Sequence, residues 1–170
     1  MANFKPQIPT VDLDSVNITN LNTKAVNLTA TFDLSFIFET PDNQNRNVSF
    51  SDIEVRVLWS GKEKITLAKK IFLPFSQEEN NVTKIRAELT MIEGFTNNSD
   101  VSAGIGAERD IGSVHVGVSL TGMFTLRDGF SDVMRHDFDG VVVKFPPGSN
   151  NGTCVLVPRP IFPILWSYVM

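Results

Sequence analysis

The chain has 170 residues, of which 42% are hydrophobic and 20% are charged, and this balance is that of one folded domain and excludes wholesale disorder. A net charge of −4 argues against a domain that binds nucleic acid mainly through a basic surface. The single cysteine excludes a framework of internal disulfides and a zinc site built on cysteine pairs.

Alternation of apolar and polar residues predicts strands along most of the chain. After a weak signal at 11–13, the first clear strand runs from Val26 to Phe38, where Ile37 is the one apolar residue on the polar face. Shorter strands are predicted at 53–59, 65–67 and 85–91. The segment 98–110 has room for one short helix, although Gly104 and Gly106 favour a flexible loop. A second long strand, 114–126, and a weaker one, 141–145, follow.

Turn-forming residues separate these runs, at Pro41-Asp42-Asn43, Ser60-Gly61-Lys62, Arg127-Asp128-Gly129 and Pro146-Pro147-Gly148. Short strands with turns between them predict an all-β fold. We expect an antiparallel β-sandwich of the immunoglobulin or fibronectin type III kind, with about seven or eight strands. The alternating faces predict a core that includes Phe32, Phe36, Phe38, Val55, Val57, Leu89, Val116, Val118, Leu120 and Phe124.

No spacing of residues predicts a catalytic or metal site. Gly104-Ile105-Gly106 lacks the third glycine in register and the flanking elements of a nucleotide-binding loop. His136 with Asp132 and Asp137 shows neither EF-hand spacing nor an HExxH pair, so a charged loop is the favoured interpretation. Cys154 lacks the signature of a catalytic thiol. We therefore expect no catalysis, no cofactor and no metal.

One non-catalytic pattern exceeds chance. Composition alone predicts about two N-glycosylation sequons, Asn-x-Ser/Thr, and the chain has six. The candidate glycosylation sites are Asn17, Asn27, Asn47, Asn81, Asn97 and Asn151. Because a glycan is bulky and needs solvent around it, these positions should face away from the core. An Asn- and Thr-rich β surface that never meets a glycosyltransferase is the competing interpretation.

An ordered set of short motifs also resembles a known family. The set comprises Pro9 to Val16, Thr40-Pro41-Asp42-Asn43, Phe50, Asp52-Ile53, Trp59-Ser60-Gly61, Phe75-Ser76-Gln77, Asn81-Val82-Thr83, Glu108, Gly112, Val114, Val118, Gly129 and Cys154-Val155-Leu156. In this order the motifs are similar to those of the type 2 late-embryogenesis-abundant domain, also called the water stress and hypersensitive response domain. The closer resemblance is to the plant harpin-induced and non-race-specific disease resistance-like proteins.

The resemblance implies a domain at 9–156, followed by an apolar C-terminal tail at 157–170. It also implies a non-enzymatic, membrane-associated domain on the outer face of the plasma membrane, linked to plant defence, with protein partners and no nucleic acid. Members of the family carry a spanning helix before the opening proline, so we expect membrane association through a segment outside these 170 residues. The alternative is a soluble intracellular domain of the same fold that protects against desiccation and other stress.

Overall fold

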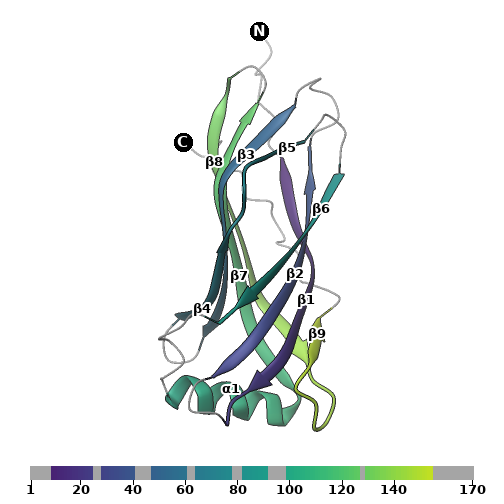
Figure 1. Ribbon diagram of the computed structural model, residues 1–170, viewed down its shortest axis with the longest axis vertical. Coiled ribbons are helices and arrows are strands. Elements are labelled where there is room, and N and C mark those ends of the chain that lie inside the picture. Colours follow the sequence, from purple (N-terminus) through teal and green to yellow (C-terminus); the bar gives the residue numbers. More distant parts are fainter. Residues whose placement is uncertain are drawn as a thin grey trace.

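The computed structural model describes residues 9–24, 28–40, 47–60, 64–77, 82–91, 99–126 and 129–154. Within these residues the chain forms nine strands and one helix (Figure 1). The elements are β1 Thr10–Asn22, β2 Thr29–Glu39, β3 Val48–Ser60, β4 Lys64–Ile71, β5 Phe75–Gln77, β6 Val82–Thr90, α1 Ser99–Ile111, β7 Ser113–Leu126, β8 Ser131–Lys144 and β9 Gly152–Cys154. The predicted tail and the end of the predicted domain, 155–170, lie outside the described residues.

The pairing of strands confirms the expected antiparallel β fold. The turn residues Ser60-Gly61-Lys62 fall between β3 and β4, which pair antiparallel with Ser60 opposite Lys64. The weak signals at 11–13 and 141–145 belong to much longer strands, β1 and β8. Both strands are interrupted by irregular pairing, which breaks the strict alternation that a sequence pattern needs.

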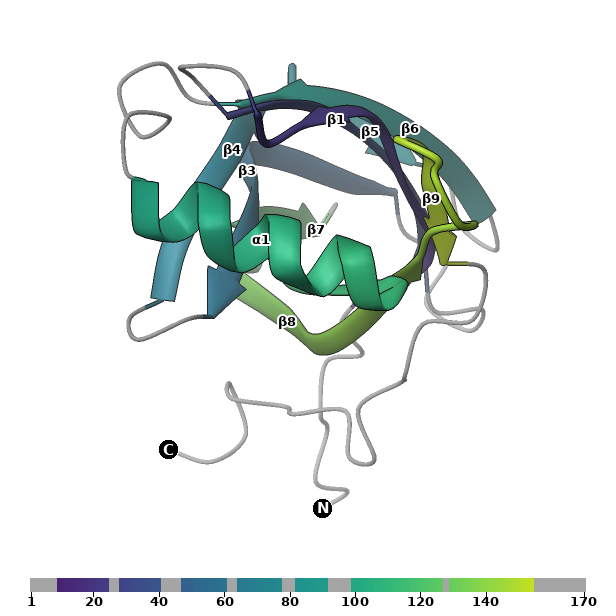
Figure 2. The ribbon, with the colours of Figure 1, turned by 90° about the horizontal axis from the view of Figure 1, so that it is seen from below.

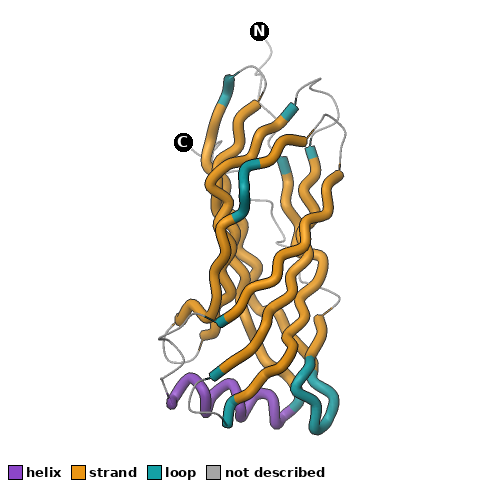
Figure 3. Tube along the Cα trace, viewed as in Figure 1, coloured by secondary structure: helices purple, strands orange, loops and turns teal. Residues whose placement is uncertain are grey.

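The strands form one nearly closed, barrel-like sheet, and this corrects the expected sandwich of two separate sheets. The order is β4-β3-β7-β8-β9-β1-β2-β6, and β5 pairs with β3 off this path. The short β9 joins the two halves because it pairs with β1 on one side and with β8 on the other. At the opposite side the edge strands β4 and β6 approach each other, where Lys70 Nζ donates to the carbonyl of Glu88 at 3.5 Å. Figure 3 shows the resulting elongated sheet.

Helix α1 lies across one end of the curled sheet (Figure 2). It confirms the helix expected near 98–110, and it overturns the interpretation of Gly104 and Gly106 as a flexible loop. The helix ends at Ile111, and the next residue, Gly112, has a φ of +112°, which suits a residue without a side chain just after a helix C-terminus. Val101 and Ile105 point into the core from the inner side of the helix.

The predicted core is confirmed, since all ten residues named from the sequence are buried. From Leu28, just before β2, to Phe38 every second residue is buried, whereas Ile37, on the other face, is half-buried. Three phenylalanines from different strands meet at the end far from the helix. The ring of Phe38 lies edge-on to Phe50 and to Phe75, at 5.2 and 5.3 Å between centroids. This cluster ties β2, β3 and β5 together.

Candidate functional site

Three of the six predicted glycosylation sites are described, and all three lie outside the core. Asn47 is exposed just before β3, and Asn151 is exposed just before β9. Asn17 is half-buried in the middle of β1, between Asp33 of β2 and Thr153 of β9. Asn27, Asn81 and Asn97 lie outside the described residues.

Asn151 lies in the loop before β9, and this loop is hydrogen-bonded to β1. The backbone N–H of Asn20 donates to Asn151 Oδ1 at 3.0 Å, and that of Leu21 donates to the carbonyl of Asn150 at 3.0 Å. These bonds satisfy backbone N–H groups of β1 where its pairing with β2 is interrupted. At this point Asn20 adopts a left-handed conformation, with φ of 54°. Because the loop binds through Oδ1, the Asn151 Nδ2 atom, which would carry a glycan, has no role in this contact.

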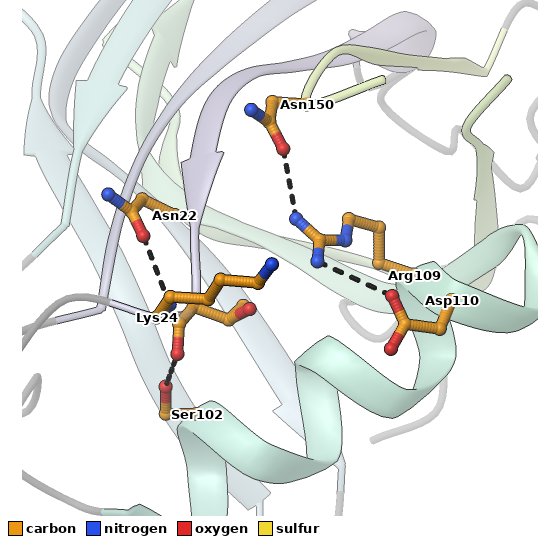
Figure 4. A network of polar contacts seen from close by, with 7 residues as sticks. Asn22, Lys24, Ser102, Arg109, Asp110 and Asn150 are labelled. Carbon is orange, nitrogen blue, oxygen red and sulfur yellow. Dashed lines mark hydrogen bonds and ion pairs between the residues drawn. The ribbon is translucent and has the colours of Figure 1, made fainter. Parts of the chain in front are cut away.

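A cleft of about 790 Å³ opens between this interruption, the C-terminal end of α1 and the turn after β8. Its lining combines three asparagines, two cations, one carboxylate and an apolar rim. The residues are Asn20, Leu21, Asn22, Lys24, Arg109, Asp110, Ile111, Gly112 and 145–150. Figure 4 shows Arg109, from the helix, and Lys24, two residues after β1, on facing sides of this region. Segments far apart in the chain therefore build one polar site.

The guanidinium of Arg109 is held in place within this site. Its side chain is only 15% exposed, and it donates from one terminal nitrogen to Asn150 Oδ1 at 2.9 Å and from the other to Asp110 Oδ1 at 3.4 Å (Figure 4). The Asp110 side chain is 73% exposed, so its charge is well solvated and neutralises Arg109 only weakly. The cleft thus contains a fixed and largely desolvated positive charge.

The helix that supplies Arg109 is fixed to the sheet by polar contacts at both of its ends. The indole N–H of Trp59 donates to Glu108 Oε2 at 2.5 Å, and the backbone N–H of His115 donates to Glu108 Oε1 at 2.8 Å. Nearer the other end, the hydroxyl of Ser102 donates to the carbonyl of Thr23 at 2.9 Å. The helix therefore presents Arg109 from a rigid support.

His136 lies in strand β8, which corrects the charged loop expected there. It is half-buried, and its ring stacks on Phe138 at 6.5 Å between centroids. Burial lowers the pKa of His136, while the charges of Asp12 and Asp137 oppose that shift. In the part of the chain that the structure describes, no three His, Cys, Asp or Glu residues are grouped to hold a metal ion.

We expect His136 to make the protein less stable in mild acid. Its pKa is lower in the folded chain than the ordinary value of 6.5, so protons bind the unfolded chain more readily. The free energy of unfolding should therefore fall as the pH drops below about 6.5 towards the folded pKa. Urea unfolding at pH 7.5 and pH 5.5 measures this loss. His136→Gln should reduce the difference between the two pH values, and an unchanged difference in this variant would contradict the prediction.

The cleft was not predicted from the sequence, although the glycosylation candidate Asn151 is next to it. Lys24, Arg109 and Asn150 are far apart in the chain, and no motif links them. The nearest signal was turn chemistry: Pro146-Pro147-Gly148 was predicted as a turn, and it forms one wall. These residues form one site only because α1 packs beside that turn.

Comparisons with known proteins add little about function. No helix among the described residues has the length and apolar character needed to cross a membrane. No family model and no curated protein matches the chain. Among solved structures, the chain is similar to a protein from Archaeoglobus fulgidus with 9% identity and a TM-score of 0.40, over 78% of this chain and 95% of that one.

Proposed function

We propose that this chain is a non-enzymatic domain of the harpin-induced and type 2 late-embryogenesis-abundant kind. In this proposal it faces the outside of the cell, is held at the plasma membrane by a segment outside these 170 residues, and acts in plant defence through protein partners. The observation that carries the extracytoplasmic location is the excess of sequons, six against about two from composition. The positions of Asn47 and Asn151 support it, because a glycan at either would project into solvent.

The family proposal has support in what its motif residues do. Trp59 and Glu108, which belong to separate motifs, meet in a hydrogen bond between β3 and α1. Gln77, from a third motif, is buried and donates to the carbonyl of Phe38 at 3.1 Å, which links β5 to β2. These residues link strands and the helix to one another, so the motifs have a structural role in this fold.

The location is tested by expressing the full native locus in plant cells and treating the product with an endoglycosidase that removes N-glycans. We expect a shift in electrophoretic mobility and recovery in the membrane fraction. Ser49→Ala and Thr153→Ala should each remove one glycan, because each deletes the hydroxyl of a sequon but retains its asparagine. Thr19→Ala should have a smaller effect, since Asn17 lies half-buried within a paired strand.

Thr153→Ser is the matched control, because it keeps the sequon and should keep the glycan. Thr153→Ala leaves the Asn151 side chain free to accept from Asn20 as before, so folding should be unaffected. No mobility shift, together with recovery in the soluble cytosolic fraction, would contradict the proposal. That result would favour the intracellular stress-protective alternative, which the single cysteine of the chain also fits.

A further inference from the structure

The cleft beside Arg109 has the size of a small-molecule site. Its volume of about 790 Å³ falls within the range of pockets that take ligands of drug size. Its walls come from the rigid end of α1, from β1 and from a turn fixed by a bond from the N–H of Ser149 to the carbonyl of Pro146 at 3.0 Å. A site with fixed walls loses little conformational entropy when a ligand binds.

The charges in the cleft favour one carboxylate. Lys24 and Arg109 contribute two positive charges, and Asp110 is the one carboxylate among the described lining residues. Arg109 uses two of its five N–H donors in the bonds to Asn150 and Asp110. The planar guanidinium keeps further N–H donors for a carboxylate. Because it is buried, each charge-assisted bond is stronger than at the surface.

The uncharged lining favours a ligand rich in hydroxyl groups. Asn20, Asn22 and Asn150 are amides, which both donate and accept hydrogen bonds, as a hydroxyl does. Ile111 at the rim is 86% exposed and lies among the lining residues with Pro146 and Pro147. These side chains offer an apolar surface to the C–H face of a sugar ring.

Two features oppose a phosphate or nucleotide ligand. The cleft borders the C-terminal end of α1, where the helix dipole is negative and disfavours dense negative charge. Among the described residues that line the cleft, the one aromatic side chain, Phe145, is 5% exposed and offers no ring on which a base could stack. A ligand with a single carboxylate, placed at Arg109 two residues before the helix end, carries less charge than a phosphate.

We propose that this cleft binds a short carboxylated saccharide, with the carboxylate at Arg109 and Lys24 and the hydroxyl groups at the three asparagines. This inference rests on the cleft alone and is independent of the proposed function. It assigns no reaction: the ligand is bound and released unchanged.

The test is calorimetric titration of the full 170-residue chain, made without glycans, with a trisaccharide of one uronic acid and two neutral sugars, called the trimer below. We expect saturable binding that locates to the cleft by chemical-shift changes at the side-chain amides of Asn20, Asn22 and Asn150. The methyl ester of the same trimer, which has no charge, should bind about tenfold more weakly or not at all. Arg109→Gln and Lys24→Gln should weaken binding of the free acid by about tenfold and a few-fold, respectively.

Lys69→Gln, a change at an exposed lysine of β4, is the matched control and should leave binding intact. If Arg109→Gln is unfolded by circular dichroism, Lys24→Gln decides, because the structure gives its ammonium no structural bond among the described contacts. The proposal is overturned by no binding of the trimer, by equal binding of acid and ester, or by equal binding of trimer and inorganic phosphate. Each of these results leaves the glycosylation test untouched.

Discussion

Replacing Phe38 by alanine is expected to lower the free energy of unfolding by about 3–5 kcal/mol. Phe38 is fully buried, and its ring contacts Phe50 on β3 and Phe75 on β5. Removing it opens a cavity where β2 packs across the core against β3 and β5, far from the helix. A loss of this size is a large part of the 5–15 kcal/mol typical of a domain. Urea or thermal unfolding followed by circular dichroism measures it.

Ile37→Ala is the matched control, because Ile37 is the neighbouring residue of the same strand on the opposite face. It is half-buried, and we expect its loss to cost about 1 kcal/mol. If one face of β2 is buried, the loss in free energy of unfolding should be much larger at Phe38 than at Ile37. Equal losses at Phe38 and Ile37 would show that this face of β2 is not the one against the core.

Replacing Gly104 by alanine is expected to destabilise the protein, although helix propensity alone predicts the opposite. In an unconstrained helix the change from glycine to alanine stabilises by about 1 kcal/mol. Here a methyl group at residue 104 would overlap the ring of Trp59, whose indole N–H is also bound to Glu108 one turn further along the helix. Forcing an extra methyl into such a contact costs about 1–3 kcal/mol, so we expect a net loss.

Gly106→Ala is the control, since it is two residues away in the same helix. Its methyl group would meet the Thr23 hydroxyl at 3.1 Å, a half-buried side chain that can move, so we expect a change near zero. The fluorescence of Trp59 should change in Gly104→Ala but not in Gly106→Ala. A gain of about 1 kcal/mol in Gly104→Ala would mean that α1 does not pack on Trp59.

The local pattern of the sequence determined the strands and their buried faces. Alternation from Leu28 to Phe38 and from Val114 to Leu126 depends on neighbouring residues only, because side chains of a strand point to opposite faces in turn. The same pattern identified the core correctly and left Ile37 on the outer face. The sequons were likewise readable, and the three described ones lie outside the core.

The tertiary structure alone decided how the sheet closes, why a helix contains two glycines and where a cleft forms. Closure depends on β9, a short strand that no pattern marks, because three residues are too few to show a period. Glycine at position 104 weakens a helix when considered by itself. It is needed there because the ring of Trp59, 45 positions earlier in the chain, leaves no room for a side chain. The Arg109 cleft likewise combines residues that come together only when α1 docks on the sheet. Contacts between distant segments produce no periodic pattern in a sequence, so the cleft could not be predicted from it.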